Sequence, residues 1–172
     1  MNKELLLLNF WNSIKKIFCY YTGLRKITTL FIKPWKKYDK LVDIDIKSLK
    51  KEGVKLLIID MDGTLKYRKT GITKENIKWV KSVKKDFDIY IITNASNYLA
   101  SKEANKIDVP YYYKARKPSK KGFNYIVNKM KVSKYEVCVI GDALVADIYG
   151  SHRSGIKKTI LVKDLNVYYD KI

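Results

Sequence analysis

The sequence predicts an α/β fold in three layers, in which helices cover both faces of a parallel sheet, preceded by an amphipathic amino-terminal helix. Two observations lead to this prediction. From residue 54 onward, short apolar runs alternate with helical patterns, and the connections between them are short. Polar residues follow directly after four of these runs. Alternating strands and helices with short connections favour a parallel sheet that is buried on both faces.

The individual elements follow from the spacing of the apolar residues. Continuous apolar or β-branched runs predict strands, and apolar residues at three- and four-residue steps predict helices. The predicted strands cover 54–59, 88–93, 111–113, 136–140 and 158–162. The predicted helices cover 73–85, 97–107, 119–131 and 143–153. With 172 residues and 47% hydrophobic content, the chain is expected to form one domain over residues 31–172.

The first 30 residues are expected to form a separate basic, amphipathic segment. Between residues 5 and 21, apolar residues recur with helical spacing: Leu7, Phe10, Trp11, Ile14, Phe18 and Tyr21. The charge-free stretch 5–14 would rise about 15 Å as a helix, half of a hydrocarbon thickness of about 30 Å, so no membrane span is expected. Two hypotheses stay open for this helix: it lies in a membrane interface, or it packs on its own domain.

The net charge of +19 indicates attraction to anionic surfaces and anionic substrates. A specific nucleic-acid partner is not expected, because only four of the 36 basic residues are arginines, which contact bases and phosphates better than lysines do. The two cysteines, Cys19 and Cys138, lie far apart and in no metal-binding spacing, which fits a reducing cytoplasm. The composition leaves the oligomeric state open.

The polar residues at the ends of the predicted strands are candidates for a functional site. They are Asp60 and Asp62 after the first strand, Thr93 and Asn94 after the second, Lys117 after the third, and Gly141, Asp142 and Asp147 after the fourth. In a parallel α/β sheet the ligand binds beyond the carboxyl ends of the strands. These side chains are therefore expected to lie close together.

The carboxylates of this set predict a site for Mg²⁺ and a phosphoryl group. Asp60 and Asp142 would repel each other without a cation, but together they offer the oxygen ligands that Mg²⁺ takes alongside phosphate oxygens. Asp60 is then a candidate to attack phosphorus and form an aspartyl-phosphate. Asp62 is the candidate general acid and base, which protonates the leaving alkoxide and later takes a proton from water.

Three further residues fit the same reaction. Gly63 gives the backbone the freedom to turn after the two aspartates. Thr93, expected at the start of a helix, is a candidate to hold the transferring oxygens, because the free amides of a helix start point the same way. Lys117 would neutralise the charge that phosphoryl transfer spreads over those oxygens.

Each of these signals also has a plainer interpretation. Asp-x-Asp-Gly occurs in calcium loops, although the glutamate that closes such a loop is missing here. Thr93 and Asn94 could simply cap a helix, Lys117 could lie in a solvated basic loop, and Asp147 could face solvent. His152 is the only histidine and has no partner motif, so it is expected at the surface.

Four segments together resemble the motifs of the haloacid dehalogenase (HAD) superfamily of phosphatases. They are DMDGT at 60–64, ITN at 92–94, KP at 117–118 and GDALVAD at 141–147. The resemblance covers about residues 54–162. It implies a Rossmann-like sheet with the strand order 5-4-1-2-3.

The same resemblance implies a role for each motif residue. Asp60 would be the nucleophile and Asp62 the general acid and base. Mg²⁺ would be held by Asp60, by the backbone carbonyl of Asp62 and by the carboxylate of Asp142. Thr93 and Lys117 would bind the phosphoryl group, with support from Asp147 and from the other motif residues Gly63, Thr64, Asn94 and Gly141.

The spacing of the motifs leaves no room for a cap domain. HAD proteins usually close the site with an insertion, either soon after the first motif or between the second and third. Here residues 63–90 and 95–116 are already occupied by predicted helices and strands. An open site loses some exclusion of water, but it admits a phosphate that is attached to something large.

Within the superfamily, RKPSKKGF at 116–123 and GDALVADIYGSHRSG at 141–155 resemble the YqeG type of subclass IIIA. This type is related to the mitochondrial phosphatidylglycerophosphatases. The chain has Gly63 where the type often has asparagine, and Thr93 where it often has serine.

The resemblance implies a Mg²⁺-dependent phosphomonoesterase that removes the terminal phosphate of phosphatidylglycerol phosphate. We expect it in the cytoplasm, peripheral on the inner face of the membrane, with the anionic phospholipid and the membrane surface as partners and the amino-terminal helix as the docking element. One alternative is a soluble substrate: a sugar phosphate, a phosphoprotein or a nucleic-acid terminal phosphate. The other is a non-catalytic module that binds RNA or ribosomes.

Overall fold

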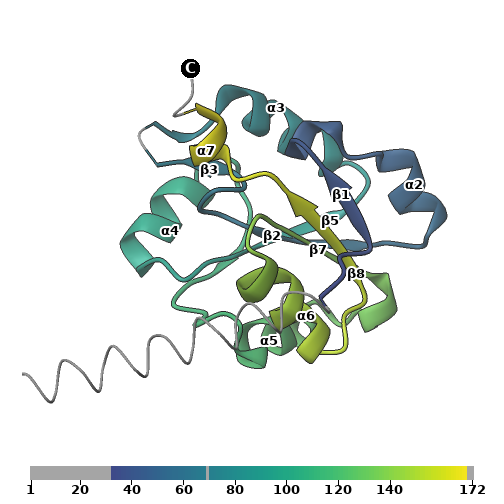
Figure 1. Cartoon of the computed structure of the whole chain (residues 1–172). Coiled ribbons are helices and arrows are strands. Elements are labelled where there is room, and N and C mark those ends of the chain that lie inside the picture. Colours follow the sequence, from purple (N-terminus) through teal and green to yellow (C-terminus); the bar gives the residue numbers. More distant parts are fainter. Residues whose placement is uncertain (1–31, 69, 170–172) are drawn as a thin grey trace, which may run out of the picture. The chain divides into compact units, whose positions relative to one another are not determined.

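A parallel sheet of six strands runs through the part of the chain that the computed structural model describes, residues 32–68 and 70–169 (Figure 1). The strands follow the order β1-β8-β7-β2-β5-β6, and every neighbouring pair is parallel. They are β1 Lys36–Tyr38, β2 Leu56–Asp60, β5 Asp88–Ile92, β6 Tyr111–Tyr112, β7 Val137–Gly141 and β8 Lys158–Val162.

Five of these strands confirm the predicted order. Strands β2, β5, β6, β7 and β8 are the predicted strands one to five, and they stand in the sheet as 5-4-1-2-3. Strand β1 was not predicted, because its sequence KKY contains no apolar run. It pairs with β8, with Lys36 opposite Ile160. A short edge strand that carries lysines discourages pairing with other chains.

Helices cover both faces of the sheet, which confirms the three layers. Successive residues of a strand point to opposite faces, so Leu57 and Ile59 of β2 join one apolar cluster while Leu56 and Ile58 join the other. Three helices complete the first cluster and one completes the second: α2 Ile46–Lys51, α3 Lys74–Val83 and α4 Asn97–Ala104 on the first face, and α5 Lys120–Met130 on the second.

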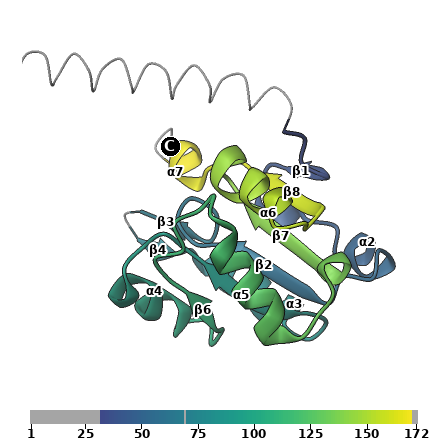
Figure 2. The same cartoon turned by 90° about the horizontal axis from the view of Figure 1, so that it is seen from below.

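The segment 143–153, predicted as one α-helix, differs from the prediction. It contains a π-helix, Leu144–Tyr149, followed by the short helix α6, Gly150–Arg153. Figure 2 shows α6 next to α5. A π-helical turn is rare and occurs mostly at functional sites. Other short elements that were not predicted are the 3₁₀ turns Leu41–Asp43 and Lys134–Glu136, helix α2, and helix α7 Leu165–Tyr169.

A small hairpin follows the first motif. Its strands, β3 Lys66–Tyr67 and β4 Gly71–Ile72, pair in antiparallel fashion and were not predicted. Apart from this hairpin and α3, residues 63–90 contain connecting loops and the start of β5, and residues 95–116 contain α4 and β6. No cap domain is therefore inserted in the described part of the chain, as predicted.

The predicted amphipathic helix at 5–21 and the segment 1–30 to which it belongs lie outside the described residues, so both stay predictions. Residues Pro34–Ile172 form one compact unit by themselves. Among the residues that the structure describes, none of the helices has both the length and the apolar character needed to cross a bilayer.

Candidate active site

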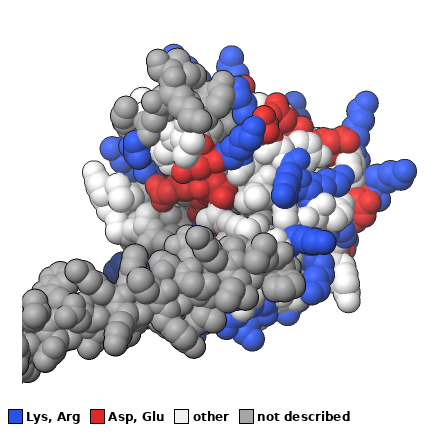
Figure 3. All heavy atoms as spheres, viewed as in Figure 1, with Lys and Arg blue, Asp and Glu red and all other residues white. Residues whose placement is uncertain are grey.

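Seven of the predicted site residues line one pocket at the carboxyl ends of the strands, while Gly63, Thr64 and Gly141 do not line it. The pocket has a volume of about 170 Å³ and is lined by Asp60, Asp62, Thr93, Asn94, Lys117, Asp142, Ala143, Ala146 and Asp147. Residues from all four motifs therefore meet at one edge of the sheet. In Figure 3 acidic side chains gather on the face toward the viewer, with lysine and arginine side chains around them.

Three carboxylates form an acidic cluster in this pocket. Asp60 ends β2, Asp142 follows β7 directly and Asp147 lies in the π-helix. One oxygen from each carboxylate lies within 4.8 Å of the other two. Burial raises the pKa of Asp60 well above its usual value, against the opposing effect of Lys117. Burial and the neighbouring Asp147 raise the pKa of Asp142 to about 6.

Lys117 is a buried cation beside this cluster. Its side chain is 4% exposed, and its Nζ forms ion pairs with Asp60 and, at 2.5 Å, with Asp147. Burial opposes the positive charge, but the two carboxylates outweigh it and raise the pKa of Lys117. The backbone N–H of Lys117 donates to Asn94 Oδ1 at 2.8 Å, which joins the second and third motifs. The alternative of a solvated basic loop is therefore wrong for this side chain.

Asp147 is fully buried, so the alternative of an exposed position is wrong as well. Its Oδ2 accepts a hydrogen bond from Ala143 N at 3.0 Å, while its Oδ1 pairs with Lys117. Gly141 provides the space for this arrangement, since a Cβ there would lie 2.4 Å from the carboxyl carbon of Asp147. A side chain at position 141 would displace Asp147 from the cluster.

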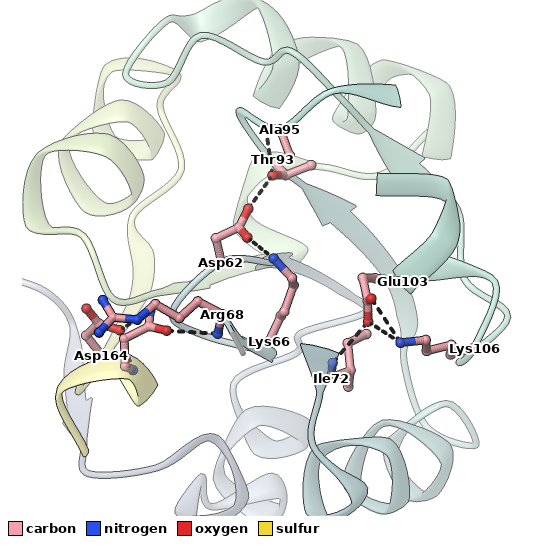
Figure 4. Close-up of polar contacts among 10 residues, drawn as sticks. Asp62, Lys66, Arg68, Ile72, Thr93, Ala95, Glu103, Lys106 and Asp164 are labelled. Atoms are coloured by element: carbon pink, nitrogen blue, oxygen red, sulfur yellow. Dashed lines mark hydrogen bonds and ion pairs between the residues drawn. The ribbon is translucent and has the colours of Figure 1, made fainter. Parts of the chain in front are cut away.

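Asp62 lies outside the acidic cluster and is held by two donors (Figure 4). Lys66 Nζ donates to its Oδ1 at 2.8 Å, and the hydroxyl of Thr93 donates to its Oδ2 at 3.2 Å. The side chain of Asp62 is 49% exposed, so it is accessible to a molecule that enters from solvent. The sequence did not predict Lys66, because a lysine after the first motif carries no signal of its own.

The prediction that Thr93 lies at the start of a helix is wrong. Helix α4 begins at Asn97 with Ser96 as its N-cap, so the alternative of a cap formed by Thr93 or Asn94 is also wrong. Thr93 follows β5 directly, and its hydroxyl accepts from Ala95 N at 3.0 Å while it donates to Asp62. It lines the pocket and orients Asp62.

The turn after Asp62 depends on Gly63, whose φ of +90° is a conformation that favours glycine. A Cβ here would lie 2.6 Å from an oxygen of Asp142 and 2.9 Å from an oxygen of Asp164, so asparagine would not fit without movement. The hydroxyl of Thr64 donates to Asp142 at 3.1 Å, which ties the first motif to the fourth. Asp164, which follows β8, was not predicted.

Two contacts hold the hairpin that carries Lys66. Glu103 of α4 is buried, accepts from Ile72 N at 3.0 Å and pairs with Lys106 at 2.8 Å (Figure 4). Directly after β3, Arg68 N donates to the side chain of Asn166 in α7 at 2.9 Å. The hairpin is thus held at β4 and just after β3, which fixes the position of Lys66 next to Asp62.

His152 does not line the pocket. It lies on α6, with its Nε2 3.3 Å from the hydroxyl of Thr159 on β8. Burial and the nearby Lys157 lower its pKa. The predicted surface position is met only in part, because the side chain is half-buried against the sheet.

The donor set of the acidic cluster fits Mg²⁺. This ion prefers oxygen ligands and is commonly bound by one or two carboxylates together with substrate phosphate oxygens. Here the carboxylates of Asp60 and Asp142 would hold the ion, together with the backbone carbonyl of Asp62. Asp147 would support these ligands from the same cluster. The three carboxylates of the cluster outnumber the buried Lys117, and a divalent cation would balance the excess negative charge.

This chain is similar to known proteins of one superfamily. A HAD-hydrolase-like family model matches residues 114–164, which contain the third and fourth motifs. The probable phosphatase YqeG of Bacillus subtilis is 33% identical over 134 residues, 77% of this chain and 77% of that protein.

Two solved structures show the same fold. An uncharacterized protein of Listeria monocytogenes serotype 4b has a TM-score of 0.54 at 18% identity, covering 69% of this chain and 100% of its own. The 3-deoxy-D-manno-octulosonate 8-phosphate phosphatase of Yersinia pestis has a TM-score of 0.53 at 15% identity, covering 74% and 75%. The 33% identity to YqeG, over most of both chains, shows the family, whereas the two solved structures show the fold alone. The chain belongs to the haloacid dehalogenase superfamily, as a phosphatase of the YqeG type.

Proposed function

We propose that this phosphatase hydrolyses the phosphate monoester of a phospholipid headgroup, the terminal phosphate of phosphatidylglycerol phosphate, at the cytoplasmic face of the membrane. The observation that carries the proposal is the pocket without a cap, because a phosphate anchored in a bilayer cannot be enclosed by a closing domain. The net charge of +19 supports it, since positive charge favours contact with anionic lipid.

In the proposed first step Asp60 is the nucleophile. A carboxylate oxygen of Asp60 attacks phosphorus, and the bond from phosphorus to the lipid oxygen breaks. Asp62 gives its proton to that oxygen, which leaves as an alcohol. Thr93 and Lys117 bind the phosphoryl oxygens. Mg²⁺ at the acidic cluster would supply further positive charge to the phosphoryl group.

In the proposed second step Asp62 acts as a base. It takes a proton from a water molecule as that water attacks phosphorus, and the aspartyl-phosphate bond breaks to release inorganic phosphate and free Asp60. Asp62 must therefore reach first the leaving oxygen and then the water. Its 49% exposure supports this assignment, because a molecule that enters from solvent can reach the side chain.

A soluble phosphomonoester is the second candidate substrate, because an uncovered pocket also admits a sugar phosphate, a phosphoprotein or a nucleic-acid terminal phosphate. A purely non-catalytic role in RNA binding has less support. Asp60, Asp62, Lys117 and Asp142 lie around one pocket, and a scaffold has no use for that arrangement.

The test is a phosphate-release screen in the presence of Mg²⁺. The substrates are phosphatidylglycerol phosphate in vesicles, a sugar phosphate, a nucleotide monophosphate and a phosphopeptide. We expect the highest kcat/KM on the lipid. Faster hydrolysis of any soluble ester than of the lipid would reject the proposed substrate.

The same screen on a chain that lacks residues 1–24 tests the amino-terminal segment. We expect activity on vesicles to fall far more than activity on a small soluble ester, because only the former needs attachment to the membrane. Equal loss on both substrates would show that the segment does not dock the enzyme.

A further inference from the structure

We propose that the edge of the sheet that carries the active site docks on an anionic lipid surface through three exposed side chains, Tyr98, Leu99 and Tyr113. We call these three residues the apolar rim. The inference rests on the proposed function, since it names the surface that would bring the pocket to a phosphate anchored in a membrane. It concerns the described body of the protein and is independent of residues 1–30.

Exposed large apolar side chains are unevenly distributed over the described residues. Six are exposed in this part of the chain: Tyr98, Leu99, Tyr113, Tyr125, Tyr135 and Val167. Four of them lie at the carboxyl edge, because α4 and α7 begin there and β6 ends there. Single exposed apolar residues are normal on a protein surface, whereas a gathering of them around a site indicates an interaction surface.

The two segments that carry the apolar rim are joined by hydrogen bonds. Residues 94–99 and 111–117 are linked by Lys114 N to Ala95 O at 3.0 Å and by the Tyr111 hydroxyl to Asn97 Oδ1 at 3.0 Å. The same segments contribute Asn94 and Lys117 to the pocket. The rim therefore lies on the same two segments as these pocket residues but does not itself line the pocket.

The chemistry of the rim suits a lipid headgroup region. Tyr98 is 72% exposed, Leu99 43% and Tyr113 42%, so each has apolar surface to transfer out of water. Tyrosine rings favour the boundary between water and lipid, where the ring is apolar and the hydroxyl stays wet. The exposed basic residues Lys114 and Arg116 lie directly beside the rim and would contact anionic headgroups.

Charge alone would not select this edge, because lysines also cover the amino ends of the strands, where Lys55, Lys84 and Lys85 lie around one shallow pocket. At that opposite edge of the described chain, the exposed large apolar side chain is Tyr135, which lies just before β7. Figures 1 and 2 show α4 and α7 on the same side of the molecule, and these helices follow the carboxyl ends of β5 and β8. The apolar side chains would therefore orient the pocket toward the bilayer.

The experiment compares two variants of the full chain. The rim variant combines Tyr98→Ser, Leu99→Ser and Tyr113→Ser. The matched control is Tyr135→Ser, which removes an exposed ring at the opposite edge of the sheet. Binding is measured by co-sedimentation with phosphatidylcholine vesicles, with and without phosphatidylglycerol, at an ionic strength of about 0.15 M. Hydrolysis of p-nitrophenyl phosphate reports whether each variant is folded with an intact site.

We expect the rim variant to bind the phosphatidylglycerol vesicles more weakly by a factor on the order of a hundred. Each of the three side chains that no longer enters the interface contributes about tenfold, and the total is reduced because each serine retains part of that contribution. The control should bind like the unaltered protein. Both should hydrolyse p-nitrophenyl phosphate at the unaltered rate, because none of the substituted residues contacts the pocket.

Unchanged vesicle binding by the rim variant, or an equal loss in the control, would overturn the docking surface. So would a rim variant that changes its oligomeric mass in sedimentation and still binds vesicles, because the rim would then be an interface between copies. If the unaltered protein binds vesicles through the rim but releases no phosphate from the lipid, the docking surface stands and the proposed substrate is wrong.

Discussion

Asp60, Asp142 and Asp147 bring three carboxylates into a pocket where Lys117 supplies a buried positive charge. Burial and this crowding raise the pKa values of Asp60 and Asp142, because an ionised carboxylate is poorly solvated there. The same crowding attracts a divalent cation, which must compete with protons for the carboxylates.

We therefore expect Mg²⁺ to bind more weakly as the pH falls through about 6, the pKa of Asp142. Below this value Asp142 is protonated and is a poor ligand, and above it the carboxylate is free to bind. The measurement is the rise in thermal midpoint that Mg²⁺ causes, compared below and above this pH. In the variant Asp142→Asn the pH dependence in this range should shrink, and an equal rise at both pH values in the unaltered protein would contradict the prediction.

The same shift has a consequence when no cation is added. A raised pKa favours the protonated form in the folded state, so the contribution of Asp142 to stability is present at low pH and is lost as the pH rises through about 6. Added Mg²⁺ should remove this loss, because it favours the ionised form.

Lys66 is expected to be a positioning residue for Asp62, because it holds one carboxylate oxygen while Thr93 holds the other. Lys66→Met should lower kcat by about tenfold to a hundredfold on an alkyl phosphate, whose leaving group needs the proton from Asp62. On p-nitrophenyl phosphate, whose leaving group needs little protonation, the loss should be small.

The matched variant Lys66→Arg keeps a cation that can donate to Asp62 and should restore much of the activity on the alkyl ester. An equal loss on both esters in Lys66→Met would instead indicate general damage to the site.

At the scale of elements, the hairpin β3–β4 depends on α4 for its position. Glu103 is buried on α4 and accepts the N–H of Ile72 on β4, while its ion pair with Lys106 compensates for its own burial. The contact joins two segments that are 31 residues apart in the chain. It also determines where Lys66 lies, because Lys66 is on the paired strand.

Glu103→Ala is expected to lower the free energy of unfolding by about 1–3 kcal/mol, since it leaves the N–H of Ile72 without its partner in a buried place. Glu103→Gln keeps an acceptor of the same shape and should lower the free energy of unfolding by less. Urea unfolding of both variants measures the difference. Equal destabilisation would mean that the hydrogen bond to Ile72 does not hold the hairpin.

For the whole molecule, the main feature is that the active-site pocket and the proposed docking surface share the carboxyl edge of the sheet. The helices of both layers and the short edge strands cover the rest of the described body, and no inserted cap covers the pocket. Large substrates are therefore admitted, and specificity has to come from the surface around the pocket rather than from enclosure.

The variant Asp60→Asn is expected to separate catalysis from vesicle binding. The change removes the nucleophile and a buried charge but keeps the size of the side chain, so we expect turnover to be abolished while the fold and vesicle binding are retained. Circular dichroism and co-sedimentation measure the last two. Residual turnover close to that of the unaltered enzyme would reject Asp60 as the nucleophile.

Much of the site could be predicted because its signals are local in sequence. Asp60 and Asp142 each follow an apolar run directly, and parallel strands bring their carboxyl ends to one edge, so the meeting of the two required only the strand pattern. The turn at Gly63 was also predictable from a local signal, because a glycine directly follows the two aspartates. Thr93 was misplaced although the predicted helix 97–107 begins where α4 does, at Asn97, because a short loop separates Thr93 from that helix.

By itself, the sequence determined the α/β layers and the acidic residues of the pocket, since hydrophobic periodicity and the position of polar residues after the strands record these directly. The strand order came only from the resemblance to the family. Only the tertiary structure decided that Lys117 and Asp147 are buried partners, that Lys66 holds Asp62, and that the apolar rim lies beside the pocket. The physical reason is that these contacts join segments distant in the chain, and their energies depend on burial and geometry that exist only after folding.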